Sequence, residues 1–255
     1  MSRLFKALSG TLALAALSIF AASCGSNGPA KVRFVQAIQD AGPLDVDVSN
    51  TNEVNTTHTF PGISFLGVQP NQPGYTSVPS GSVTVAGFLQ GTTTQVFSNT
   101  VGLSSGAQYT EIATGFSQPP STNGSNVVLL SILDFIPTPP TGAVGFRVIH
   151  ASPSGPGTVD VYILQNPSAG PIGAPAFSAL AYTQASGYLF LPFNPNNDTN
   201  PPGFTVYVTT AGGVNPIITE SVNPATAGAV RTLVLTDVQD GTTMSSSFLE
   251  LSDID

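Results

Sequence analysis

The stretch VRFVQA (32–37) recurs later in the chain as FRVIHA (146–151), which sets Arg33 against Arg147. Self-similarity at a fixed period is the sequence signature of repeated structural units. Three further pairs of segments follow in the same order and at a nearly constant separation: LDVDV (44–48) with VDVYI (159–163), PGYTSV (73–78) with SGYLFL (186–191), and GAQYTEIATG (106–115) with GAVRTLVLTD (228–237). The chain therefore contains two copies of one unit.

The composition between the two copies predicts where the first unit ends and the second begins. IPTPPTG (136–142) is rich in proline, and proline makes a linker short and stiff. We therefore expect a first domain over residues 31–135, a linker over 136–142 and a second domain over 143–255.

Within each unit the apolar residues alternate with polar ones. In TVDVYIL (158–164) every second residue is Val or Ile, so these side chains share one face of an extended chain. About seven or eight such runs occur in each unit, bounded by Gly, Pro and Asn, and this pattern is typical of strands. We expect an all-β chain of two tandem immunoglobulin-like, Greek-key β-sandwiches. The chain has no Trp and a single Cys, so the Cys and Trp signature of true immunoglobulin domains is missing.

The N-terminus has the pattern of an export signal. Residues 1–6 carry Arg3 and Lys6 without an acid, and residues 7–20 are apolar with small interruptions, as in a secretory signal peptide. The apolar run is shorter than the roughly 20 residues that cross a bilayer. AASC (21–24) resembles the lipobox of bacterial lipoproteins, which implies that Cys24 is acylated. We expect a signal peptide over 1–23 and a lipidated cysteine with a tether over 24–30.

By the same resemblance, Gly25, at the place where an Asp would retain a lipoprotein at the inner membrane, favours the outer membrane or the cell surface. The alternative is an ordinary signal peptide that leaves a free thiol, which is a liability in an oxidising compartment. The lipid would attach the chain to the membrane, because two or more acyl chains anchor a protein stably.

The charge of the chain excludes one class of partner. Without residues 1–23, four cations, Lys31, Arg33, Arg147 and Arg231, stand against fourteen acids. Such a chain cannot neutralise a phosphate backbone, so we expect no nucleic-acid partner. Charged residues make up only 8% of the chain, where about 25% is usual. We expect no cofactor. The composition is compatible with a protein partner in the envelope or outside the cell.

The second unit resembles a known family at its beginning. RVIHASP (147–153), followed by VDVYI, is similar to the opening of a bacterial domain family of unknown function that occurs in tandem in secreted and lipid-anchored proteins. The first unit departs from the pattern, with Gln36 in place of the His and Asp47 in place of the Tyr. The resemblance implies β-sandwich modules outside the cell and no established activity.

Two of the cations stand at matching places, and each unit has an Asp at the start of its second predicted strand. We expect Arg33 to pair with Asp45, and Arg147 with Asp160, in charge-assisted bonds between the first two strands. Their role would be structural, fixing the register of the strands.

Two patterns could be interpreted as catalytic. GLSSG (102–106) fits the G-x-S-x-G motif around Ser104, but it leads into a predicted strand and not into a helix, so we expect a loop. His150, Ser152 and Asp160 could form a triad. The first unit has Gln36 and Ile38 where the second has His150 and Ser152, so we expect His150 to bond a neighbouring backbone group and no residue to be catalytic.

Metal binding has weak candidates. Asp45 and Asp47 lie two apart on one predicted strand, and Asp198 lies in an Asn-rich loop. Calcium takes six to eight oxygen ligands, and neither stretch has the calcium-binding loop of an EF-hand. We therefore expect solvated turns at these residues and no metal site.

These observations favour a lipid-anchored, non-catalytic module of the cell envelope that serves adhesion, structure or protein contact. The alternative is an envelope protein that binds a carbohydrate, another small ligand or calcium, and an envelope hydrolase is the least supported of the three. A concave cleft with convergent polar groups would favour the alternative.

Overall fold

The computed structural model describes residues 28–50, 56–118, 126–165, 170–171, 173–193, 203–223, 226–240 and 243–255. Every regular element within these ranges is a β-strand, which confirms the all-β prediction. The same ranges contain no helix of the length and apolarity that crossing a membrane requires. The predicted signal peptide, Cys24 and Asp198 lie outside the described residues.

The strands of the first repeat form two sheets, named inner sheet 1 and outer sheet 1. Inner sheet 1 has the order β4-β1-β8-β9, with β5 also paired to β1: β4 (Val68–Gln69), β1 (Ala30–Ile38), β8 (Gln108–Gly115), β9 (Val128–Leu133) and β5 (Thr76–Val78). Outer sheet 1 has the order β3-β2-β6-β7: β3 (Thr57–Ile63), β2 (Leu44–Asn50), β6 (Gly81–Leu89) and β7 (Gln95–Leu103).

The second repeat has a matching pair of sheets, named inner sheet 2 and outer sheet 2. Inner sheet 2 has the order β13-β10-β16-β17: β13 (Leu189–Pro192), β10 (Ala143–His150), β16 (Val230–Asp240) and β17 (Thr243–Ile254). Outer sheet 2 has the order β12-β11-β14-β15: β12 (Phe177–Ala181), β11 (Thr158–Gln165), β14 (Phe204–Thr210) and β15 (Pro216–Val222).

The strand pairing is the same in both repeats. β1 runs parallel to β8, and β10 runs parallel to β16, whereas the pairs β2·β6 and β11·β14 are antiparallel. These pairs join strands that are not consecutive in the chain, as Greek-key connections do. The predicted tandem immunoglobulin-like arrangement is compatible with this order, and the predicted boundaries of the domains and linker stay a prediction.

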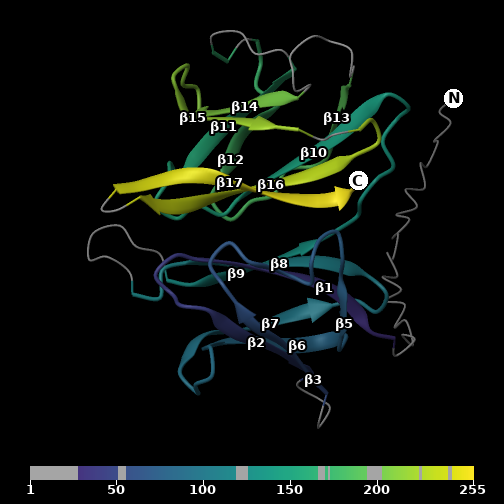
Figure 1. Ribbon diagram of the computed structural model, residues 1–255, viewed down its shortest axis with the longest axis vertical. Coiled ribbons are helices and arrows are strands. Elements are labelled where there is room, and N and C mark those ends of the chain that lie inside the picture. The colour runs from purple at the N-terminus through teal and green to yellow at the C-terminus, as the bar shows by residue number, and fades with distance from the viewer. Residues whose placement is uncertain are drawn as a thin grey trace, which may run out of the picture.

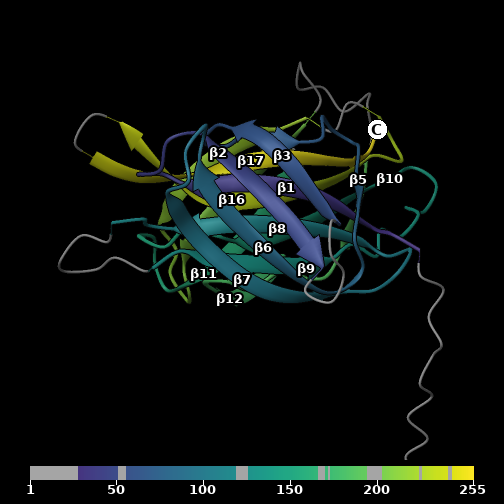
Figure 2. The ribbon, with the colours of Figure 1, turned by 90° about the horizontal axis from the view of Figure 1, so that it is seen from below.

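The four sheets are stacked along the long axis of the molecule (Figure 1). From bottom to top they are outer sheet 1, inner sheet 1, inner sheet 2 and outer sheet 2, and Figure 2 looks onto the strands of outer sheet 1 from below. One apolar cluster fills each sandwich, with Phe34 in the first and Phe146 in the second. A third cluster joins the inner sheets through residues that include Val35, Ile112 and Ile149.

The third cluster changes the burial of the inner strands. In β2, which belongs to an outer sheet, buried and half-buried residues alternate as predicted from the sequence. In β10 every residue is buried, and in β1 only Lys31 is exposed. The alternation fails there because the second face of each inner sheet packs against the other repeat and not against water. The inner strands are therefore continuous runs of buried residues, as in sheets covered on both sides.

Candidate functional site

Arg33 lies on β1, on the face that points away from the core of its own sandwich. Its neighbours Val32 and Phe34 belong to that core, and successive side chains of a strand point to opposite faces. The guanidinium is fully buried, and its Nε and Nη2 donate to Thr110 Oγ1 at 3.0 and 2.9 Å. Its central carbon lies 5.2 Å from the centre of the Tyr75 ring. The threonine and the ring hold the guanidinium between them.

Arg147 has the same surroundings in the second repeat. It lies on β10 between Phe146 and Val148, which face the core of that sandwich. Its Nε donates to Thr232 Oγ1 at 3.0 Å, and its guanidinium lies 4.8 Å from the centre of the Tyr188 ring. The fold therefore builds one Arg, Thr and Tyr arrangement twice.

Each repeat adds an aspartate at its end. Asp134 follows β9, and its Oδ2 accepts hydrogen bonds from the tyrosine and threonine hydroxyls of its own repeat at 2.8 and 2.5 Å. Asp253 lies near the end of β17, and its Oδ2 accepts from the matching hydroxyls at 3.1 and 2.6 Å. Both carboxylates are thus fixed by residues of their own repeat and keep Oδ1 for another partner.

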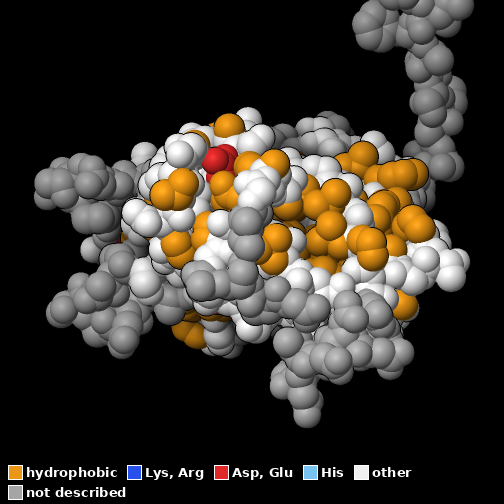
Figure 3. All heavy atoms as spheres, turned by 90° about the horizontal axis from the view of Figure 1, so that it is seen from above, with side chains coloured by type: hydrophobic (Ala, Val, Ile, Leu, Met, Phe, Trp, Pro, Cys, Tyr) orange, Lys and Arg blue, Asp and Glu red, His pale blue; other side chains and the backbone are white. Residues whose placement is uncertain are grey.

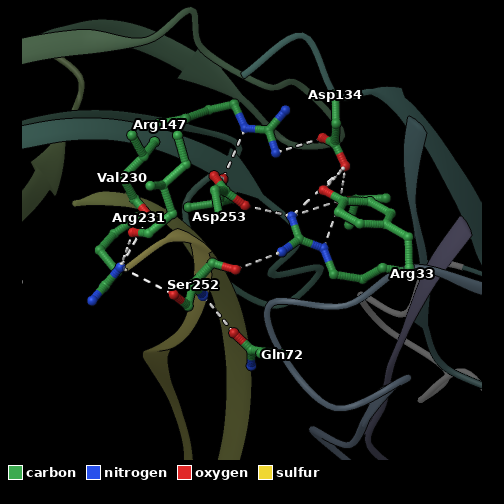
Figure 4. A network of polar contacts seen from close by, with 12 residues as sticks. Arg33, Gln72, Asp134, Arg147, Val230, Arg231, Ser252 and Asp253 are labelled. Carbon is green, nitrogen blue, oxygen red and sulfur yellow. Dashed lines mark hydrogen bonds and ion pairs between the residues drawn. The ribbon is translucent and has the colours of Figure 1, made fainter. Parts of the chain in front are cut away.

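The arginines pair with these aspartates crosswise (Figure 4). Arg33 Nη2 lies 2.7 Å from Asp253 Oδ1, and Arg147 Nη2 lies 2.7 Å from Asp134 Oδ1. Arg33 Nη2 also lies 3.7 Å from Asp134 Oδ2. The four side chains are at most 3% exposed. We refer to the two arginines, two threonines, two tyrosines and two aspartates as the Arg–Asp network.

Burial shifts the titration of groups in this network. It raises the pKa of Tyr75 and of Tyr188, which therefore stay protonated and donate to the aspartates. Burial opposes the charge of Arg147, but Asp134, Tyr188 and Asp253 together raise its pKa. The two tyrosine hydroxyls are therefore fixed donors to the aspartates of the network.

The predicted pairs Arg33–Asp45 and Arg147–Asp160 are wrong. Asp45 lies on β2 of outer sheet 1, next to Leu44 and Val46, which face the core. Arg33 points from inner sheet 1 toward the second repeat, so the whole sandwich core separates it from Asp45. The same alternation separates Arg147 from Asp160 on β11 of outer sheet 2.

Asp45 and Asp160 have a shared structural role of another kind. Asp45 accepts from the backbone N–H groups of Gly62 at 2.7 Å and Gly91 at 2.9 Å, and these bonds lower its pKa. Asp160 accepts from the N–H groups of Ala179 and Gly212, both at 2.7 Å. All four donors have positive φ. Asp45 therefore joins β3 to the turn after β6, and Asp160 joins β12 to the turn after β14.

His150 and Gln36 occupy matching places and form the same two bonds. His150 Nδ1 accepts from the N–H of Ser152 at 3.4 Å, and its Nε2 faces the carbonyl of Pro156 at 2.9 Å. Because a carbonyl only accepts, Nε2 carries the proton. Gln36 Oε1 accepts from the N–H two residues on at 3.0 Å, and its Nε2 donates to the carbonyl six residues on at 3.4 Å. The prediction that His150 bonds backbone groups is confirmed.

The residues considered for a triad do not form one. Ser152 Oγ donates to Asp237 in a short hydrogen bond and lies 3.0 Å from Ser246 Oγ. Asp160 points away from His150, because its carboxylate accepts from the N–H groups of Ala179 in β12 and Gly212 in the turn after β14. Burial lowers the pKa of His150, and both ring nitrogens are occupied by the backbone, so the ring has no free lone pair to act as a base.

The other candidates are also accounted for within the described ranges. Ser104 lies in the turn between β7 and β8, and its N–H donates to Tyr109 Oη at 3.0 Å, so the predicted loop is confirmed. Asp47 accepts from Thr59 Oγ1 at 2.6 Å. In the part of the chain that the structure describes, no group of three or more His, Cys, Asp or Glu side chains could hold a metal ion.

The sequence prediction missed the aspartates of the network. Aligning LLSILDF (129–135) with FLELSDI (248–254) would have placed Asp134 and Asp253 at matching positions near the ends of the two repeats. It would not have shown that each aspartate pairs with the arginine of the other repeat. The sequence prediction also missed Glu111 on β8, which is fully buried and accepts a hydrogen bond from Ser131.

The family model described as "Domain of unknown function (DUF4397)" matches residues 30–162, just over half of the chain. The chain belongs to this family. The match begins at the start of β1 and ends within β11 of the second repeat. No curated protein matches the chain.

Three solved structures are similar to the chain at a low level. The Bacillus anthracis TIE protein is 11% identical, with a TM-score of 0.25 over 82% of this chain and 34% of that one, so the chain spans about a third of its length. A CBM26 module of Eubacterium rectale Amy13K, solved with maltoheptaose, is 10% identical, with a TM-score of 0.21 over 85% and 96% of the two chains. A putative adhesin from Bacteroides ovatus is 12% identical, with a TM-score of 0.23 over 86% and 95%. Scores this low carry no weight for fold or function.

Proposed function

We propose that this protein is a non-catalytic module of the cell envelope, anchored by a lipid on Cys24, that serves as a rigid body for adhesion or protein contact. The observation that carries the proposal is the bonding of His150. The side chain that most resembles a catalytic base performs the same backbone contacts as Gln36 in the other repeat. A position that accepts either residue serves the scaffold.

The surface of the body is consistent with contact through uncharged groups. The face around outer sheet 2 shows hydrophobic side chains gathered among uncharged polar ones (Figure 3). Val214 and Ile217, in the β14–β15 hairpin, are 76% and 47% exposed. Such a face fits a partner bound through shape and apolar contact and not through long-range charge.

The anchoring part of the proposal rests on the sequence around Cys24 and is tested by replacing that residue. Cys24→Ala should abolish labelling by a fatty-acid probe, because no acyl chain can attach. Ser26→Ala, two residues along the tether, is the matched control and should keep the label. Fatty-acid labelling that persists in the Cys24 variant would contradict the lipid anchor.

A further inference from the structure

The Arg–Asp network contains one interaction formed twice. Arg33 and Asp134 belong to the first repeat, and Arg147 and Asp253 stand at the matching places in the second. Each arginine binds the aspartate of the other repeat at the same distance of 2.7 Å. Each aspartate is oriented by the tyrosine and threonine of its own repeat. Each repeat therefore carries both halves of the interaction.

The apolar part of the interface has the same property. Val35 and Ile149 stand at matching places in β1 and β10, two residues beyond the arginines, and both belong to the cluster between the inner sheets. Ile112 and Val234 match in β8 and β16, two residues beyond the threonines, and belong to the same cluster. The two repeats therefore contact each other through equivalent surfaces.

An interface in which the same patch meets itself is the kind that joins the two subunits of a twofold-symmetric dimer. We infer that the inner sheet of each repeat is a self-complementary docking surface that can bind a second copy of the same repeat. In this chain the two repeats form the equivalent of such a dimer within one polypeptide. In a pair of first repeats, Arg33 of each copy would meet Asp134 of the other. In a pair of second repeats, Arg147 would meet Asp253.

Some contacts at the interface lack the twofold relation. Gln72, in the loop between β4 and β5, donates to the carbonyl of Glu250 and accepts from the N–H of Ser252. Thr114 Oγ1 donates to the carbonyl of Ala151 at 2.5 Å. These contacts favour the pairing of unlike repeats, so that pair should be the most populated when all pairings are allowed.

The experiment frees the repeats without removing a described residue. A protease site is inserted between Thr138 and Pro139 in the chain from residue 25 onward, and the folded protein is cleaved. Uniformly ¹⁵N-labelled and unlabelled samples are then mixed and followed by native mass spectrometry, which distinguishes the repeats by mass. Complexes with one labelled half show that the repeats have exchanged partners. We expect the unlike pair to dominate, with both like pairs present.

A charge exchange across the interface is the matched control. Arg33→Asp together with Asp253→Arg keeps opposite charges in the unlike pair, but it leaves the first repeat with only acids in the network and the second with only arginines. The like pairs should then fall at least tenfold, whereas the unlike pair remains. If this variant does not fold, the cleaved wild-type protein decides alone.

Three results would overturn the inference. The first is partner exchange that yields only unlike pairs in the wild-type protein, and the second is complete separation of the cleaved repeats. The third is persistence of the like pairs in a folded charge-exchange variant.

Discussion

The two repeats differ at the end of their first strands and agree at the middle of them. At the end, Gln36 of the first repeat stands where the second has His150, yet both side chains bind the N–H two residues on and the carbonyl six residues on. In the middle, Arg33 and Arg147 each contact a threonine, a tyrosine and an aspartate that stand at matching places in the two repeats. The comparison indicates that glutamine can take the structural role of the histidine, whereas the network uses the same residue types in both copies.

The comparison predicts its largest effect at the network. Asp134→Asn keeps the size of the side chain but leaves Arg147 buried without its carboxylate, and removing one partner of a buried ion pair costs about 3–5 kcal/mol. The free energy of unfolding from urea titration measures the effect. Glu250→Gln, which removes a 39% exposed partner of Arg231, is the control and should cost less than about 1 kcal/mol. Equal losses of stability in the two variants would contradict the claim that the buried network stabilises the fold more than an exposed ion pair does.

A second difference between the repeats lies at Glu111, because the matching position of the second repeat is Leu233. Glu111 is buried, one of its oxygens has no hydrogen-bond partner among the described residues, and burial raises its pKa to about 7 from 4.5. At Glu111 the folded state therefore binds more protons than the unfolded state between pH 4.5 and 7. The stabilisation that Glu111 contributes should fall by about 3 kcal/mol as the pH rises through this window and level off above it.

Glu111→Gln should remove this fall, because glutamine stays neutral at every pH. Chemical denaturation at several values from pH 4 to 8 measures it. Asp47→Asn, on the outer face of β2, is the control and should keep the wild-type pH dependence. An unchanged fall in the Glu111 variant would show that another group causes it.

The smallest effect on the free energy of unfolding is expected at His150, where the two repeats have different residues with the same bonds. His150→Gln places in the second repeat the side chain that the first repeat already uses, so it should change the free energy of unfolding by less than about 1 kcal/mol. His150→Ala loses both backbone bonds and leaves buried polar groups unpaired, which costs about 1–3 kcal/mol. Urea titration of both variants compares them. If glutamine were as harmful as alanine, the matching roles of the two residues would be refuted.

The sequence predicted the repeated unit and its strands because both depend on local pattern. Alternation in LDVDV identified the core face of β2 correctly. In β1 the polar residues Arg33 and Gln36 are buried as well, because this strand is covered on both faces. The ion pairs were assigned wrongly for a physical reason. Arg33 and Asp253 lie 220 residues apart and in different repeats, and no local pattern indicates how two sandwiches meet. Asp45 and Asp160 were identified as matching positions, but their backbone partners depend on turns that only the structure places.

The most direct test of the joint between the repeats is a pair of double-mutant cycles read by urea unfolding. One cycle combines Arg33→Gln with Asp253→Asn, and the other combines Arg147→Gln with Asp134→Asn. We predict coupling energies of about 1–3 kcal/mol in both cycles, because in each pair Nη2 lies 2.7 Å from the carboxylate of the other repeat. A coupling near zero in either cycle would contradict a joint built from two equivalent ion pairs.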